Sequence, residues 1–423
     1  MQQPVARVVQ MTPGIHSHPG PREDSCPIRY ARLSVFITWR TVVLDGRTDS
    51  VSATNHATRT DPGGGPACTD ARAVEGSATG PVDATLPRVT VIVPIRNEAD
   101  FIESCVNSIR RSDYPGDRLQ IIVVDGMSSD GSPDLVQRLA REDSRIQLFE
   151  NPDRIVPRAM NLALRNATGD IIVRIDGHTE VPDWFISRSV TTLMSQPGCW
   201  CAGGAIETVS QTFVGRVIAA CMASPVGVGN ARFRLGGFDG NVDTLAFGAY
   251  WKWVFDRLGG FDEELVCNQD DEFNARLIAA GGRIYQSSAI SSRYYSRTTL
   301  SQLARQYFRY GYWRIRTIQK LGRPATVRQM IPMLFVLTLT GLIVSALLWP
   351  PSRIVLWSVL VAYAVTLLLG AIQVARRLGV TSALLSPVVF LILHLAYGFG
   401  CCCGLVRFGV LNRKQSPPGT RQG

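Results

Sequence analysis

Hydrophobic and polar residues follow two different periods between residues 88 and 195. Short runs rich in Val and Ile predict strands at residues 89–94, 119–124, 146–149 and 171–175. Between these runs, apolar residues spaced three or four apart predict helices at 98–111, 134–141, 156–166 and 182–195. Four successive strand–helix units predict an α/β domain whose parallel sheet is covered by helices on both faces.

The rest of the chain has a different texture. Residues 199–296 are less regular and rich in glycine, so we expect a second half of the domain with longer loops. Three apolar stretches follow, at 331–349, 354–375 and 383–405, and each is about long enough to cross the ~30 Å hydrocarbon core of a bilayer. The third contains Pro387 and His394, so the pattern leaves two or three membrane spans open.

These patterns divide the chain into five expected parts. They are a disordered tail at 1–86, the α/β domain at 87–300, an amphipathic interfacial helix region at 301–328, transmembrane helices at 329–406, and a disordered tail at 407–423.

The charge distribution indicates which side of a membrane the α/β domain occupies. No Asp or Glu follows Glu272, whereas 18 Lys and Arg do, and eleven of these lie between Arg276 and Arg328. A basic segment beside a span favours the cytoplasmic side, which predicts a multi-pass plasma-membrane protein with a cytoplasmic domain. Basic and aromatic residues also alternate at 307–314, as in nucleic-acid-binding proteins. The adjacent spans explain the charge more simply, so we expect no nucleic-acid partner.

Two predicted strands end in an acid followed by glycine. The first ends at Asp125-Gly126 and the second at Asp176-Gly177-His178. Ligands bind outside the carboxyl ends of strands in open α/β sheets, so both acids are candidates for a ligand crevice. Asp125 is expected to accept hydrogen bonds from a pyrimidine or a ribose, and capping of its own loop is the alternative.

Asp176 and His178 combine a carboxylate with an imidazole, a pair that suits Mn²⁺ or a similar divalent ion. His178 could instead bind phosphate or pack. Arg96 and Glu98 follow the first strand and border the same crevice, although Glu98 is equally suited to the first turn of a helix.

A third acidic group opens a predicted helix at Gln269-Asp270-Asp271-Glu272. Acids at a helix start are ordinary partners of the helix dipole. Three in a row also crowd like charges, which raises at least one pKa toward the working range of a general base. Asp270 is the first candidate for a catalytic base and Asp271 the second.

One face of a later helix combines polar and aromatic residues. Gln306, Arg309, Tyr310 and Trp313 fall at spacings that place them together. Arg309 supplies a cation for a diphosphate, Gln306 a hydrogen bond, and the aromatic rings a stacking wall for a sugar or a lipid phosphate. A helix lying on the membrane surface is a second interpretation of the same pattern.

Taken in order, these motifs resemble family 2 glycosyltransferases with the GT-A fold, a Rossmann-like nucleotide-diphospho-sugar transferase domain. The resemblance rests on residues 91–98 (VIVPIRNE), the 125–130 loop, Arg158-Ala-Met-Asn161, Asp176-Gly177-His178 and Gln269-Asp270. It covers roughly residues 88–315. The chain looks closest to the membrane-associated branch that includes the succinoglycan glucosyltransferase of exopolysaccharide synthesis.

The resemblance implies an inverting transfer from a UDP- or GDP-sugar. Asp176 would hold Mg²⁺ or Mn²⁺, with His178 as the candidate second ligand from its own chemistry, and Asp270 would be the base. The residues that it implies for binding the nucleotide-sugar are Pro94, Arg96, Glu98, Asp125, Arg158, Gln306 and Arg309.

The chain departs from the family pattern at four positions. The usual Asp-x-Asp is Asp-Gly-His, the Glu-Asp pair is Gln269-Asp270, and Gly126 stands where many members have a second Asp. Tyr310 replaces the Trp that is typical of processive members, which weakens the case for a polymerase.

We therefore expect a membrane-anchored enzyme that moves a sugar to a lipid-linked saccharide acceptor in cell-envelope or exopolysaccharide synthesis. Three alternatives remain. A polyprenyl-phosphate sugar transferase would use the same residues on a lipid phosphate. A processive polysaccharide synthase would need more spans. An inactive scaffold would bind nucleotide at the membrane without turnover.

Overall fold

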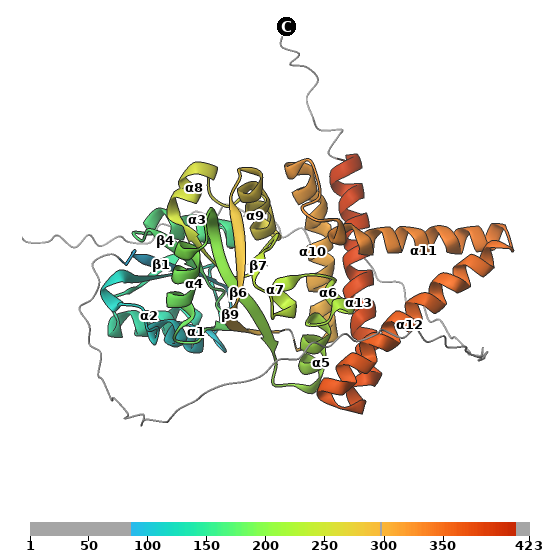
Figure 1. Ribbon diagram of the computed structural model, residues 1–423, viewed down its shortest axis with the longest axis horizontal. Coiled ribbons are helices and arrows are strands. Elements are labelled where there is room, and N and C mark those ends of the chain that lie inside the picture. Colours follow the sequence, from blue (N-terminus) through green and yellow to red (C-terminus); the bar gives the residue numbers. More distant parts are fainter. Residues whose placement is uncertain (1–85, 297, 412–423) are drawn as a thin grey trace, which may run out of the picture. The chain divides into compact units, whose positions relative to one another are not determined.

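A computed structural model describes residues 86–296 and 298–411 (Figure 1). Of the disordered tails expected at 1–86 and 407–423, residues 1–85 and 412–423 lie outside the described residues, whereas residues 407–411 are helical. The sheet in the described part of the chain has nine strands, of which eight lie in the order β3-β2-β1-β4-β8-β6-β9-β5 while β7 pairs with β9. The strands are β1 (Val89–Ile95), β2 (Leu119–Asp125), β3 (Ile146–Glu150), β4 (Ile171–Arg174), β5 (Thr179–Glu180), β6 (Cys199–Val209), β7 (Gly240–Asn241), β8 (Gly248–Trp251) and β9 (Arg283–Tyr295).

Helices cover both faces of this sheet, as the strand–helix alternation predicts. One face packs on α1 (Ile102–Arg110), α2 (Ser132–Glu142) and α4 (Phe185–Ser195). The other packs on α3 (Val156–Asn166), α8 (Lys252–Leu258) and α9 (Gln269–Ala279). Successive side chains of a strand point to opposite faces, so Val91 and Val93 enter the first core and Ile92 the second. The predicted α/β architecture is confirmed.

The parallel arrangement predicted for the first four strands is confirmed, and the sheet becomes mixed beyond β4. The strands β3, β2, β1 and β4 are parallel, but β8 runs antiparallel to both β4 and β6. The two longest strands, β6 and β9, pair in parallel with register shifts after Cys199 and after Gly203. Each shift breaks the two-residue alternation of side chains. The period that identifies a strand is therefore lost in the glycine-rich segment.

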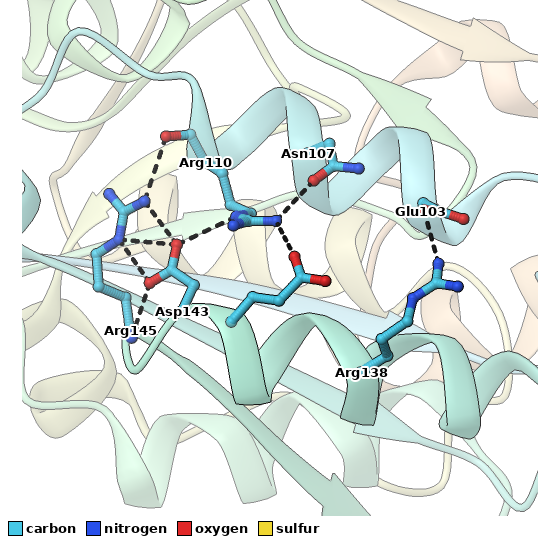
Figure 2. A network of polar contacts seen from close by, with 7 residues as sticks. Glu103, Asn107, Arg110, Arg138, Asp143 and Arg145 are labelled. Carbon is cyan, nitrogen blue, oxygen red and sulfur yellow. Dashed lines mark hydrogen bonds and ion pairs between the residues drawn. The ribbon is translucent and has the colours of Figure 1, made fainter.

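A partly exposed polar network joins α1 to α2 on the first face of the sheet (Figure 2). Arg110 contacts Glu142 and Asp143, in each case at 3.2 Å. Arg145 lies 2.7 Å from Asp143, and its hydrogen bonds outweigh the effect of burial and lower the pKa of Asp143 to about 2. Arg138 and Glu103 form a further pair at 2.7 Å. We call these residues the α1–α2 network.

The remaining long helices are α5 (Phe213–Met222), α10 (Leu300–Leu321), α11 (Ile331–Leu348), α12 (Ser352–Leu378) and α13 (Val380–Gly404). The shorter elements are η1 (Gly116–Arg118), α6 (Pro225–Val228), α7 (Arg232–Leu235), η2 (Val327–Met330) and η3 (Leu405–Leu411). Within the described residues, three helical segments are long and apolar enough to cross a membrane, namely Val327–Leu348, Ser352–Leu378 and Val380–Gly409.

The third of these segments differs from the other two. In the most apolar 18-residue stretch of this segment, 39% of the residues are buried within the protein, whereas the corresponding share is 17% in each of the other two segments. It packs along α10 (Figure 1), and glycines bring the two backbones together. A Cβ at Gly400 would lie 2.1 Å from the Phe308 carbonyl oxygen, and a Cβ at Gly311 would lie 2.0 Å from that of Tyr397. Small residues at these positions therefore permit a close helix–helix contact.

Candidate active site

The carboxyl ends of β1, β2 and β4 meet at one edge of the sheet. Register places Ile95, the last residue of β1, opposite Asp125, the last residue of β2. On its other side β1 pairs with β4, whose last residue Arg174 is followed two positions later by Asp176. The two strand-end acids that the sequence singles out thus flank β1 at the same edge, where open α/β sheets bind ligands.

The loops after β1 and β2 hold each other. Asp125 is 3% exposed, and its carboxylate accepts hydrogen bonds from the Ser128 amide at 2.9 Å and the Ser128 hydroxyl at 2.5 Å. The Asn97 amide donates to the Ser128 hydroxyl, and the Ser129 amide donates to the Asn97 side chain. Asp125 therefore does cap its own loop. As the last residue of β2, it also lies at the edge of the sheet where the crevice is expected. Nucleotide contact by Asp125 stays a prediction.

Glu98 and His178 form a pair between the loops that follow β1 and β4. Glu98 Oε1 lies 2.9 Å from His178 Nδ1. Burial lowers the pKa of His178, but the Tyr294 phenol and the Glu98 carboxylate outweigh it and raise this pKa to about 10. Gly177 makes the approach possible, because a Cβ there would lie 2.7 Å from Ile95 Cγ2. The Glu98 carboxylate is thus committed to His178 in this structure.

Arg174 joins the two other acidic positions, and the sequence analysis did not select it. It contacts Asp176 Oδ1 at 3.0 Å and Asp270 Oδ2 at 3.3 Å. Its side chain is 8% exposed, whereas those of Asp176 and Asp270 are 23% and 31% exposed. One buried guanidinium therefore contacts a carboxylate from the loop after β4 and a carboxylate from α9. The available signal was a charged residue inside the apolar run IIVRI at 171–175.

Asp270 and Asp271 are neighbours in sequence but not in environment. Burial raises the pKa of Asp270 and the adjacent Asp271 charge raises it further, while Arg174 opposes both. Burial alone would raise the pKa of Asp271, but Arg314, 2.5 Å away, lowers it below its usual range. Asp271 is thus engaged by a cation from α10. Asp270 keeps the more accessible carboxylate and the raised pKa that suit a general base.

The remaining predicted residues lie on β1, just after it, and on α10. Pro94 pairs with Val124 inside β1, and Arg96 is exposed beside Gly126. Gln306 donates to the Tyr310 hydroxyl at 2.9 Å. Arg309 interacts with Cys267, which lies two positions before Gln269, the first residue of α9.

Arg158 lies near the start of α3 and lines a pocket with Asn151, whose backbone amide donates to the Asp125 carbonyl oxygen. Arg158 pairs with Asp153 and Glu263, and none of the carboxylates above borders this pocket of about 420 Å³. The structure brings Asp176, Asp270, Glu98 and His178 to one edge but does not bring Arg158 to them.

The same edge offers few protein ligands for a metal ion. The described residues contain no group of three or more His, Cys, Asp and Glu that could hold one. Mg²⁺ and similar ions are often held by one or two carboxylates together with substrate phosphates, so a small set is sufficient. Asp176 supplies a partly exposed carboxylate. His178 has Nδ1 on Glu98 and a buried Nε2 without a hydrogen-bond partner. Because the pKa of His178 is raised, a metal ion must displace a proton from the imidazole before Nε2 can bind it. This donor set fits a divalent ion that a diphosphate completes.

Comparisons with known proteins identify the family and the fold. The family model for glycosyl transferase family 2 matches residues 90–220. The chain is 31% identical over 261 residues to the succinoglycan biosynthesis protein ExoA of Rhizobium meliloti (strain 1021), a match that covers 61% of this chain and 78% of that protein.

A second relative comes from Methanococcus voltae and is named dolichyl N-acetyl-alpha-D-glucosaminyl phosphate 3-beta-D-2,3-diacetamido-2,3-dideoxy-beta-D-glucuronosyltransferase. It is 24% identical over 327 residues, which cover 75% of this chain and 97% of the relative. Among solved structures, a mannosyltransferase from Pyrobaculum calidifontis in complex with GDP-Man and Mn²⁺ superimposes with a TM-score of 0.51 at 22% identity. That match covers 73% of this chain and 88% of the other and shows a shared GT-A-like fold.

Proposed function

This chain belongs to glycosyl transferase family 2, and on that premise we propose that it moves one sugar from a UDP- or GDP-sugar to a lipid-linked saccharide at a membrane. The names of its relatives support this acceptor class. One is a succinoglycan biosynthesis protein, and the other is a transferase acting on a dolichyl-phosphate-linked sugar. The GDP-Man and Mn²⁺ in the neighbouring structure support a nucleotide-sugar donor and a divalent ion.

The observation that carries the proposal is the shared contact at Arg174. It brings Asp176, from the donor half of the sheet, and Asp270, from the start of α9, within reach of one guanidinium. Glycosyl transfer needs charge control at the departing diphosphate and a base at the acceptor hydroxyl. In this proposal Asp176 serves the diphosphate and Asp270 serves the acceptor hydroxyl.

In the proposed reaction, Asp270 accepts the proton of the acceptor hydroxyl. The freed oxygen attacks the anomeric carbon from the face opposite the diphosphate, and the bond between that carbon and the diphosphate oxygen breaks with its electron pair on the leaving group. The anomeric configuration is therefore inverted. Mg²⁺ or Mn²⁺ held by Asp176 and His178 would supply neutralisation of the departing diphosphate. Asp271 remains paired with Arg314 and takes no proton.

The nucleotide is assigned to the edge formed by β1 and β2. Asp125 receives the base or ribose, with Pro94, Arg96 and Glu98 around it, and Arg158 extends the site outward. Gln306 and Arg309 on α10 face the acceptor side. Arg309 supports this through its contact with Cys267, just before the start of α9.

We place the catalytic domain, residues 87–300, on the cytoplasmic side of the plasma membrane. The interfacial region is assigned to 301–328 and the membrane helices to 329–406. Support comes from the three apolar helices and from the eleven basic residues that lie between Arg276 and Arg328. The acceptor lipid would then approach the site from the inner leaflet.

The test uses the full chain in membranes offered a panel of labelled UDP- and GDP-sugars and a lipid extract. The expected result is one labelled, organic-extractable product whose new linkage has the anomeric configuration opposite to that of the donor, by nuclear magnetic resonance. Asp270→Asn serves as the matched inactive control. A long labelled polymer would indicate a processive synthase, and no label transfer with any donor would contradict the proposal.

A further inference from the structure

Arg314 connects the start of α9 to a candidate membrane helix. Its side chain is 6% exposed and lies on α10. Nη2 donates to Asp271 Oδ2 at 2.5 Å and to Asn268 Oδ1 at 3.0 Å. Nε donates to the Tyr397 hydroxyl on α13 at 3.1 Å. A single guanidinium thus contacts two residues that flank Asp270 and one residue of α13.

The turn that carries Asp270 is held on both sides by α10. Asn268 adopts a left-handed backbone conformation with φ of 63°, and its amide group donates to the Tyr310 carbonyl oxygen at 3.0 Å. Asp271 lies directly after Asp270 and is held by Arg314. Because Asp270 lies between these residues, clamping both of them fixes the direction of its carboxylate toward Arg174.

The helix that presents Arg314 is itself fixed by backbone contact. Gly311 lies one turn before Arg314, and a Cβ there would meet the Tyr397 carbonyl oxygen at 2.0 Å. Gly404 approaches the Tyr312 carbonyl oxygen in the same way, at 2.4 Å for an added Cβ. Because the two helices are in backbone contact, the Cα of Arg314 has little freedom to move.

We propose that Arg314 is a positioning residue for Asp270, and that through it the candidate membrane helix α13 holds the catalytic turn in its working geometry. The identification of Asp270 as the base rests on the proposed function. Arg314 contacts Asp271, Asn268 and Tyr397, so it acts on Asp270 through these residues.

The first arm of the test is a double-mutant cycle in the full chain, assayed with the UDP- or GDP-sugar that the wild type turns over. Arg314→Met and Asp271→Asn should each lower kcat about 10- to 100-fold, because small displacements of a catalytic group have effects of this size. The KM for the donor should stay within about threefold, since the donor edge is untouched. The double variant should lose no more than the worse single variant.

The matched control is Arg316→Met on the same helix. Arg316 pairs with Glu264, whose side chain is 61% exposed, so this change should leave kcat at the wild-type value. Tyr397→Phe is the milder variant if Arg314→Met does not fold. It removes one hydrogen-bond acceptor from Arg314 and should lower kcat about two- to fivefold at constant donor KM.

The second arm does not depend on turnover. Hydrogen–deuterium exchange of the full chain in lipid nanodiscs reports the protection of amides around 268–272. Arg314→Met and Tyr397→Phe should speed exchange there, and Arg316→Met should not. If the wild type turns over no donor, the proposed function fails while exchange still decides whether the clamp exists.

Wild-type kcat in both Arg314→Met and Tyr397→Phe would overturn the proposal. Multiplying losses in the double variant would do so too, because independent losses mean that Arg314 does not act through Asp271. Unchanged exchange in all variants would show that no clamp holds the turn.

Discussion

Two groups of arginines in this protein differ in burial and in their partners. We infer that one group stabilises the fold, whereas the other also organises the candidate active site. In the α1–α2 network, the side chains of Arg110 and Arg145 are each 25% exposed and that of Arg138 is 52% exposed (Figure 2). At the candidate active site, Arg174 and Arg314 are 8% and 6% exposed. Exposed pairs contribute little to stability because water and salt screen them. Buried pairs are costly to break, since the remaining charge stays without compensation.

The partners differ as well. The α1–α2 network ties two helices together through Glu103, Glu142 and Asp143. The buried arginines pair with Asp176, Asp270 and Asp271, the carboxylates at the site. A site that collects acids for a diphosphate and an acceptor hydroxyl needs cations to keep those acids together. The first network should therefore affect stability alone, and the second both stability and catalysis.

The largest expected effect is that of Asp270→Asn. The amide cannot accept the hydroxyl proton, so kcat should fall by about 10²–10⁴-fold, the usual contribution of a general base. Donor affinity by calorimetry should be unchanged, because the donor edge lies on β1 and β2. An Asn variant with more than a tenth of wild-type turnover would refute the assignment of the base.

Asp176→Ala should come next. It removes the one carboxylate that we assign to the metal ion, so Mn²⁺-dependent binding of UDP or GDP should be lost, and a chelator should have the same effect on the wild type. Titration calorimetry with and without Mn²⁺ measures this directly. Equal nucleotide affinity for the variant and the wild type in Mn²⁺ would show that the ion is held elsewhere or is not used.

The two networks can be compared directly by Arg174→Met and Arg110→Met. Loss of Arg174 leaves two facing carboxylates without a cation, so we expect a loss of about 3 kcal/mol in stability together with strongly reduced turnover. Loss of Arg110 should reduce stability by about 1 kcal/mol or less and leave turnover intact. Thermal unfolding and kcat measured on the same preparations check both. Equal losses of stability in the two variants would remove the distinction between the networks.

Asp143→Asn in the α1–α2 network should, like Arg110→Met, have a small effect that is confined to stability. The pKa of Asp143 is lowered from 3.8 to about 2 in the folded protein, so the folded state binds fewer protons than the unfolded state. The resulting stabilisation is present above about pH 4 and is lost as the pH falls toward 2. We expect the variant to be about 1 kcal/mol less stable at pH 7, with unchanged kcat and a difference that shrinks in acid. A difference in unfolding midpoint that grows in acid would contradict this assignment.

The donor half of the domain could be predicted from the sequence because its chemistry is local. Strands β1 to β4 are short apolar runs, and Asp125 and Asp176 lie at or just beyond their ends, so the position along the strand indicates the position in the crevice. The resemblance to family 2 glycosyltransferases with the GT-A fold is confirmed by the family model, by the relatives and by the fold. The site roles stay predictions.

The second half of the domain could not be predicted because its structure depends on contacts between residues far apart in the sequence. The glycine-rich strand β6 and its partner β9 contain bulges and polar residues, which hide the alternation of side chains. Arg314 is one of many basic residues before the spans, and only the fold shows that it is buried against Asp271. The proline and glycines of the third apolar stretch left its role open, and its packing against α10 accounts for the glycines.

The central claim is that carboxylates from separate parts of the chain converge on one metal-bound diphosphate. The most direct measurement is a structure of the full chain with UDP or GDP and Mn²⁺, in which the anomalous signal locates the ion. We predict one Mn²⁺ between Asp176 and the diphosphate, the nucleoside along Asp125, and the Asp270 side chain facing the space beyond the diphosphate. An ion or nucleotide bound away from Asp176, or an Asp270 carboxylate that shares no cavity with either, would contradict the account.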